Sequence, residues 1–208
     1  MKLYTYPPAP SPQRVEIFMK EKAIEIAAEH VDMTASEQLQ PAYKAINPRG
    51  TVPTLVLDDG TAISEVIAIC QYLEAIYPET PLFGTTAKEK ALVCEWDHRI
   101  EMECLWAIAD VFRNQGDHFK GRAMPGSLDL EQIPELVDRG RLRLDAFFKI
   151  LDRQLAEHEF VTGDNFTMAD ITAYVAMNFI GWIKVSMPDE LTNLKRWFHA
   201  VAKRPSVS

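Results

Sequence analysis

The 208-residue chain has few cysteines and no long uninterrupted apolar run. Cys70, Cys94 and Cys104 form no CxxC pair and no zinc-ligand spacing, which excludes a disulfide framework and indicates reduced thiols in a cytoplasmic protein. The most apolar stretch, residues 171–185, is short and interrupted by polar side chains, so it predicts a buried helix and no membrane span. The first ten residues, MKLYTYPPAP, lack the apolar segment of a secretory signal.

Positive charge is also scarce. The chain has 22 basic and 30 acidic residues and a formal net charge of −8. This balance excludes a broad surface for nucleic acid or for an anionic membrane. Hydrophobic residues make up 47% of the chain and charged residues 25%, which is typical of a globular protein with a core of its own. We therefore expect no metal, nucleic-acid or membrane partner.

The N-terminal part alternates strand and helix patterns. Residues 2–6 predict a strand, Ser11 and Pro12 a helix start with serine as the cap, and residues 25–31 a second strand. A β-α-β order favours a parallel pair of strands with a right-handed crossover. The sequence therefore predicts an α/β module that begins with a parallel pair.

A hairpin and a helix follow. Two apolar runs meet at Asp59-Gly60, which predicts a tight turn between antiparallel strands. The next segment has helical periodicity, with Ser64 as the expected cap and Pro78 beyond its end. The first module thus closes as a small mixed sheet with helices on its faces.

The remainder shows only helical patterns. Residues 78–86 have the proline and glycine content of a linker, and we place domains at 1–78 and 87–208. Helices are expected at 87–114 and 135–157, from Thr167, and from near Asp189. Thr167 and Asp170 form a capping-box variant at the third of these starts. The fold class is therefore α/β followed by all-α.

One position in the first module is unusual for a strand entry. Val52-Pro53 directly precedes the apolar run that starts the hairpin. Proline donates no hydrogen bond to a strand ladder, so it sits at strand edges, bulges or first positions. Such a proline leaves the backbone groups of the preceding residue open to another partner.

These features together resemble the cytosolic glutathione S-transferase family, of bacterial type and with the class left open. The segments that carry the resemblance are EQLQPAYKAINPRGTVPTLVLDDGTAISEVIAICQYLE, GDNFTMADI and WFHAVAKRPSV. The resemblance covers nearly the whole chain. It implies a thioredoxin-like N-terminal domain that binds glutathione and an all-helical C-terminal domain that contributes the pocket for an electrophile.

The resemblance also implies positions for glutathione. A cis Val52-Pro53 bond would let the Val52 backbone pair with the cysteinyl part, as an added strand does. Glu65 and the Val66 N–H would hold the γ-glutamyl end at a helix N-terminus. The family usually has Glu-Ser there, and loss of a serine hydroxyl contact to a charged group removes roughly 1.5–3 kcal/mol. Gln38 is expected near the glycyl carboxylate, where Arg49 is the nearest cation.

The residue that activates the thiol is the point at which the chain departs most from the family. Many relatives have serine or cysteine directly before a proline in a pattern like S/C-P-x-x-x-R-V, and the matching stretch here, APSPQRV, has Ala9. Ser11 is the first candidate, Tyr6 at the strand end is the second, and activation without any side chain is the third. A cysteine redox role at this position is excluded, because no cysteine precedes Cys70.

The helical part offers further candidates. Met102, Leu105 and Trp106 are expected to line the hydrophobic pocket, with Phe112 further along. The family forms two-fold homodimers, and Glu101 matches a position where relatives often reach toward the glutathione of the partner subunit.

The resemblance implies conjugation of the glutathione thiolate to small hydrophobic electrophiles in cytoplasmic detoxification. Ala9 and Val66 keep two alternatives open. One is a binding or regulatory protein without turnover, and the other is a glutathione-dependent isomerase, dehalogenase or peroxidase. The sequence does not identify the electrophile.

Overall fold

The computed structural model describes residues 1–207 as two compact units. The first unit holds Met1–Thr80 together with Met124–Asp129. The second holds Pro81–Ala123 and the chain from Leu130 onward. The domain limits at 78 and 87 stay predictions, and no local pattern indicated that Met124–Asp129 would pack with the first unit.

The first unit is built on a four-stranded mixed sheet. Its strands are β1 (Lys2–Thr5), β2 (Ala27–His30), β3 (Thr54–Val56) and β4 (Ala62–Ser64), in the order β2-β1-β3-β4. β1 is parallel to β2, and β3 is antiparallel to both β1 and β4. The predicted parallel pair and the predicted hairpin are both confirmed.

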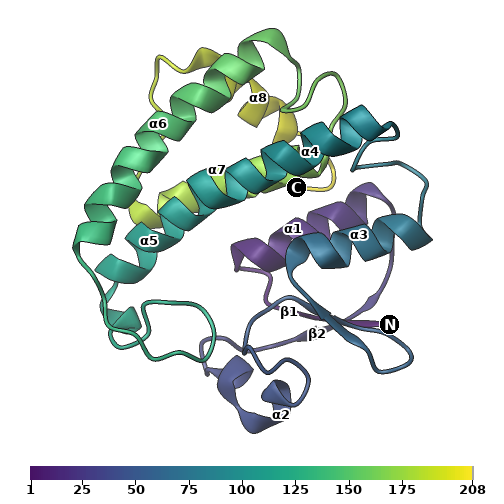
Figure 1. Ribbon diagram of the computed structural model, residues 1–208, viewed down its shortest axis with the longest axis vertical. Helices are drawn as coiled ribbons and strands as arrows, with labels where there is room; N and C mark the ends of the chain where they lie inside the picture. The colour runs from purple at the N-terminus through teal and green to yellow at the C-terminus, as the bar shows by residue number, and fades with distance from the viewer. Residues whose placement is uncertain (208) are drawn as a thin grey trace. The chain divides into compact units, whose positions relative to one another are not determined.

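Helices cover both faces of this sheet. α1 (Pro10–Glu21) and α3 (Val66–Ile76) lie side by side on one face, and α2 (Pro41–Lys44) lies on the other (Figure 1). Alternate β1 residues point to opposite faces, so Leu3 is buried on the α1 and α3 side. On the α2 side a cluster forms from the buried residues Val31, Tyr43 and Val52, with Tyr4, Tyr6 and Met33 packed against it.

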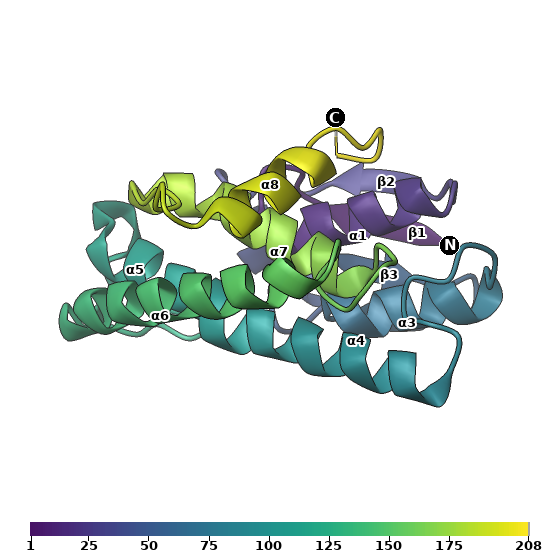
Figure 2. The same cartoon turned by 90° about the horizontal axis from the view of Figure 1, so that it is seen from above.

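The second unit is helical, as predicted. Its helices are α4 (Ala87–Arg99), α5 (Trp106–Gln115), α6 (Glu135–Glu157), α7 (Met168–Phe179) and α8 (Thr192–Val201). It also has 3₁₀ turns at Asp117–Phe119 and Ile180–Ile183, and the first unit has one at Glu37–Leu39. α7 contacts both α4 and α8 and lies between them in Figure 2. Every α7 residue except Asn178 is buried, which is why its sequence is apolar on all sides.

The helix starts show how local signals act. Thr86 and Glu89 form a capping box at α4, and Thr167 and Asp170 form one at α7. The predicted range of α6 is confirmed at both ends. The start expected near Asp189 was wrong by three residues, because α8 begins at Thr192.

The helix expected as one piece over residues 87–114 is also different in detail. The segment Ile100–Leu105, between α4 and α5, is a π-helix. A π turn inserts an extra residue between hydrogen-bonded groups and leaves a carbonyl available for another donor. Arg143 donates to the carbonyl of Met102 in this segment. Within the described residues, no helix is long and apolar enough to cross a membrane.

Candidate functional site

The first unit gathers its unusual backbone in the loop that enters β3. Val52-Pro53 is a cis peptide, which confirms the prediction. Buried polar side chains support the turn before it. Asn47 Nδ2 donates to the Thr51 carbonyl at 2.9 Å, and the Tyr43 hydroxyl donates to the same carbonyl at 2.7 Å. The loop is therefore held by the helix–turn segment before it.

The Val52 backbone has no hydrogen-bond partner within the described chain. The pairing of β3 with its neighbours ends at Thr54, which lies opposite Tyr4 on one side and Ser64 on the other. Neither the N–H nor the carbonyl of Val52 has a hydrogen-bond partner among residues 1–207. A free donor and acceptor on one residue at a strand entry suit main-chain pairing with an extended peptide.

The start of α3 is the second part of the site. Glu65 is its N-cap, with φ of 76°, and no side chain caps the first turn. Ser64 was predicted as the cap, and that prediction was wrong because Ser64 is the last residue of β4 and pairs with Thr54. The N–H of Val66 thus lies in an uncapped first turn, where the helix dipole favours an anion.

Glu65 is an acid with an unusual backbone. Its positive φ is rare for a residue with a side chain, and such conformations cluster at functional sites. Its carboxylate forms an ion pair with Arg49, and both side chains are largely exposed, at 56% and 65%. An exposed pair contributes little to stability, so the pair leaves Glu65 accessible to a charged ligand.

Gln38 supplies a buried polar group without a partner. The residue is 4% exposed, and its Oε1 has no hydrogen-bond partner within the part of the chain that is described. Unpaired buried amide oxygens are rare in folded proteins, because desolvation is then uncompensated. Gln38 lies beside Gly50, whose added Cβ would be 3.0 Å from the Gln38 carbonyl. The structure thus brings Gln38 to the loop that carries Arg49 and Val52.

The two candidate activators follow the C-terminal end of β1, the end at which β3 begins. Ser11 was predicted as the cap of α1, but the helix begins one residue earlier, at Pro10, and Ala9 is the N-cap. Proline at the first helical position explains the shift. The half-buried Ser11 hydroxyl is therefore free of capping. Since Pro10 and Pro12 have no N–H, Ser11 supplies a backbone donor to this helix start that its proline neighbours lack.

Tyr6 is placed differently. Its ring lies 5.4 Å from that of His30, and it packs against the Val31, Tyr43 and Val52 cluster. Tyr6 therefore stays next to Val52, on the α2 face of the sheet.

The candidates of the second unit lie at and just after the π segment. Glu101 is half-buried, Met102 is 46% exposed, and Leu105 and Trp106 are half-buried. Cys104 between them is fully buried, and burial raises the pKa of its thiol far above the usual range. An inert thiol fits a structural role for Cys104.

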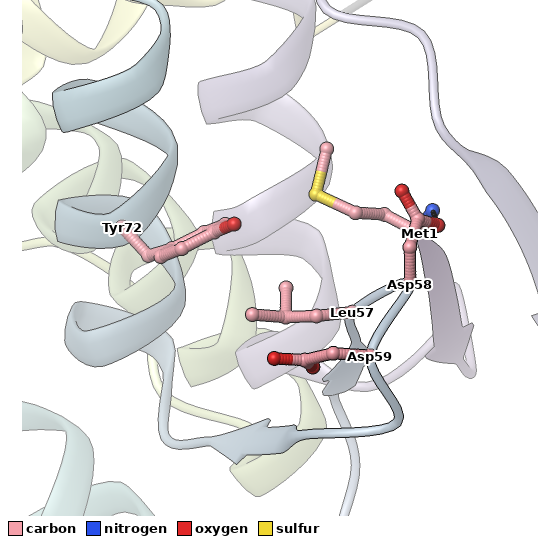
Figure 3. A pocket seen from close by; sticks show the side chains of 5 residues that line it. All are labelled: Met1, Leu57, Asp58, Asp59 and Tyr72. Atoms are coloured by element: carbon pink, nitrogen blue, oxygen red, sulfur yellow. Dashed lines mark hydrogen bonds and ion pairs between the residues drawn. The ribbon is translucent and has the colours of Figure 1, made fainter.

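A separate hollow of about 280 Å³ lies at the β3–β4 turn. It is lined by Met1, Leu57, Asp58, Asp59 and Tyr72 (Figure 3). The amino group of Met1 pairs with Asp58, and Asp59 accepts from the Thr61 N–H at 2.9 Å. Because Leu57 follows β3 whereas Val52 precedes it, this hollow is at the far end of the strand from the site.

Sequence reasoning missed three features of the site: the positive φ of Glu65, its pairing with Arg49, and the π segment. The pairing depends on residues 16 positions apart, so no local pattern reports it. The sequence also did not predict that the side-chain oxygen of Gln38 is unpaired. Within the described chain, no group of three or more His, Cys, Asp or Glu side chains is arranged to hold a metal ion.

Comparisons with known proteins point to the same family in both the N-terminal and the C-terminal part of the chain. The family model described as "Glutathione S-transferase, N-terminal domain" matches residues 9–76, and "Glutathione S-transferase, C-terminal domain" matches residues 114–205. Glutathione S-transferase 2 of Saccharomyces cerevisiae is 34% identical over 212 residues, which cover 100% of this chain and 88% of that protein.

Two further relatives extend the comparison. A glutathione S-transferase domain-containing protein of Marinobacter aquaeolei has a TM-score of 0.92 and 33% identity, covering 100% of both chains. Maleylacetoacetate isomerase of Pseudomonas aeruginosa is 29% identical over 187 residues, covering 72% of this chain and 87% of that protein. The relatives thus include proteins named for transfer and one named for isomerisation.

Proposed function

Since this chain belongs to the glutathione S-transferase family, we propose that it conjugates the thiolate of glutathione to small hydrophobic electrophiles. The observation that carries the proposal is the unpaired Val52 backbone at the entry to β3. The cysteinyl part of glutathione has one N–H and one C=O at the spacing of a strand residue. It would pair with Val52 as a short antiparallel strand, with Pro53 ending the protein's own ladder.

The charged ends of glutathione have matching partners. The γ-glutamyl carboxylate would accept from the Val66 N–H in the uncapped first turn of α3, and Glu65 would accept from the ammonium. Gln38 would donate from its side-chain amide to the glycyl carboxylate. Arg49, which pairs with Glu65, balances the acid when no ligand is bound.

Activation of the thiol requires only moderate stabilisation. Lowering the pKa of a cysteine thiol from about 8.5 to about 6.5 corresponds to about 2.7 kcal/mol. The Ser11 hydroxyl at the start of α1 is the first candidate donor to the thiolate, and Tyr6 is the second. The thiol proton passes to solvent, the sulfur forms a bond to the electrophilic carbon, and the leaving group departs with the electrons of its own bond.

The helical unit would supply the contacts to the electrophile. Met102, Leu105 and Trp106 are partly exposed apolar side chains at and beside the π segment. We further propose a homodimer in which Glu101 reaches the ammonium of the glutathione bound to the partner subunit. A cytoplasmic location and a role in detoxification complete the proposal.

A second candidate function is glutathione-dependent isomerisation, favoured by the similarity to maleylacetoacetate isomerase. Both reactions begin with attack of the thiolate on an electrophilic carbon. They differ in the next step, because an isomerase releases the glutathione again. A third possibility, binding without turnover, rests on Ala9 and Val66, which depart from the family pattern.

Turnover measured with a substrate panel tests these functions. The purified protein is mixed with glutathione and, separately, haloarenes, epoxides, organic peroxides and cis-enone diacids. We expect saturable conjugation of at least one hydrophobic electrophile. Isomerisation of the enone alone would support the second function, and binding of glutathione without any turnover would support the third.

The same assay identifies the activator. Ser11→Ala should raise the pKa of bound glutathione, read from thiolate absorbance against pH, and leave the dissociation constant nearly unchanged. Tyr6→Phe is the matched control, because it also removes a single hydroxyl. An effect of Tyr6→Phe alone would assign the role to Tyr6, and no effect of either variant would assign it to backbone donors.

A further inference from the structure

The segment Met124–Asp129 belongs to the first unit although it lies between α5 and α6 in the sequence. Within this segment, Gly126 lies against the backbone of Arg49. A Cβ placed on Gly126 would lie 3.1 Å from the carbonyl oxygen of Arg49, closer than nearly all real Cβ contacts. Gly126 also has φ of 97°, a conformation that favours glycine. The absence of a side chain thus lets this segment touch the Arg49 backbone.

A second glycine makes the same kind of contact on the same loop. Gly50, with φ of 63°, follows Arg49, and its added Cβ would lie 3.0 Å from the Gln38 carbonyl and 3.1 Å from Leu39 Cδ2. The stretch Arg49-Gly50 is therefore packed by backbone against Gln38 through one residue and against Gly126 through the other. Both contacts precede Val52 by two or three residues.

The base of the segment is anchored by hydrogen bonds. The Ala123 N–H donates to the Leu130 carbonyl at 2.9 Å, which closes the segment into a loop. Arg113 Nε donates to the Ala123 carbonyl at 3.1 Å, and its Nη2 donates to the Arg122 carbonyl at 2.7 Å. These hydrogen bonds hold the residues on either side of the segment.

We propose that Gly126 is a positioning residue for glutathione binding: through its contact with the Arg49 carbonyl, the segment Met124–Asp129 fixes the loop that carries Arg49 and Val52. The inference rests on the proposed function. The exposed Arg49–Glu65 ion pair adds little to holding this loop. Hydrogen bonds from Asn47 and Tyr43 fix it at Thr51, and the packing of Gly126 adds a contact at Arg49. The position of Arg49 in turn decides how much of the Glu65 charge is available to the ligand ammonium.

The chain offers a control glycine close by in the sequence, between α5 and α6. Gly121 also has positive φ, at 71°, but its added Cβ would meet only Glu131 Oε1, at 3.9 Å. Gly121→Ala and Gly126→Ala therefore both place an alanine at positive φ. Only the second places a methyl group against the Arg49 backbone.

The experiment measures glutathione binding by calorimetry and unfolding by urea for both variants. We expect Gly126→Ala to raise the dissociation constant at least fivefold and Gly121→Ala to change it less than twofold, with similar losses of stability. In turnover, Gly126→Ala should raise KM for glutathione and leave kcat at saturating glutathione within twofold, which separates positioning from general damage.

Each other outcome contradicts the inference in a distinct way. Equal affinities of the two variants would overturn it while leaving the proposed function intact. Absence of glutathione binding by the unaltered protein would overturn the proposed function as well. If Gly126→Ala does not fold, Gly126→Asn replaces it, since asparagine tolerates positive φ. Failure of both to fold would make Gly126 a folding residue and reject its role in positioning.

Discussion

Two buried polar side chains, one in each unit, differ in their hydrogen bonding. In the helical unit, the fully buried Asp170 accepts from the Val161 N–H at 2.9 Å, the Thr167 N–H at 3.0 Å and Trp197 Nε1 at 2.9 Å. Burial nevertheless raises the pKa of Asp170 to about 6. In the sheet unit, Gln38 Oε1 is buried without a partner in the described chain. Asp170 is thus satisfied within the helical unit, whereas Gln38 keeps an unpaired acceptor in the sheet unit.

Unusual backbone conformations are also distributed unevenly between the two units. Among the described residues, five non-glycine residues have positive φ. Four of them are in the sheet unit: Ala23, Ser36, Glu65 and Thr80. Lys184 is the fifth, at the end of a 3₁₀ turn in the helical unit. Such conformations are unfavourable and persist where the surroundings enforce them. These differences predict that stability depends mainly on the helical unit and recognition of glutathione on the sheet unit.

The strongest test of this division removes the best-satisfied buried group. Asp170→Ala leaves the N–H groups of Val161, Thr167 and Trp197 unpaired, so we expect the free energy of unfolding to fall by about 3 kcal/mol or more. Urea unfolding measures the change. Asp164→Ala, at an exposed position of the same turn, is the control and should stay within about 0.5 kcal/mol. Equal effects of the two variants would contradict a stabilising role for Asp170.

In the sheet unit, we expect a substitution to lower the affinity for glutathione and to leave stability nearly unchanged. Glu65→Gln keeps the shape of the side chain and removes its charge, so it should raise the dissociation constant of glutathione several-fold because a charge-assisted contact is lost. Stability should change by no more than about 0.5 kcal/mol, since the ion pair with Arg49 is exposed. Calorimetry and urea unfolding measure the two quantities. An unchanged binding isotherm would leave Glu65 with only its place at the helix start.

The smallest expected effect concerns Glu89, which belongs to the capping box of α4 in the helical unit. The N–H groups of Thr86 and Thr85 lower the pKa of Glu89 to about 2. Because the folded pKa is below the unfolded value, the stabilisation from Glu89 is present above about pH 4.5 and is lost as the pH falls toward 2. Glu89→Gln should therefore shift acid unfolding of the protein to slightly higher pH.

The matched control is Glu95→Gln, at an exposed position on the same helix. Circular dichroism recorded against pH follows both variants. If both give the same acid midpoint as the unaltered protein, the capping box at α4 contributes nothing measurable.

Local chemistry explains most of what the sequence predicted. The capping box at Thr167 and the turn at Asp59-Gly60 involve groups within a few residues, so a single stretch of chain carries their patterns. The two wrong caps show the limit of this reading. Several prolines compete to begin α1, which hid the start at Pro10, and the ladder partner of Ser64 is ten residues away at Thr54.

Residue patterns along the sequence determined the α/β and all-α organisation, and the family resemblance implied the cis bond before Pro53 and the candidate residues Val52, Glu65 and Gln38. Only the tertiary structure decided the pairing of Glu65 with Arg49, the unpaired oxygen of Gln38 and the contact of Gly126 with the Arg49 backbone. The physical reason is distance along the chain. Burial and ion pairing depend on partners that only folding brings together.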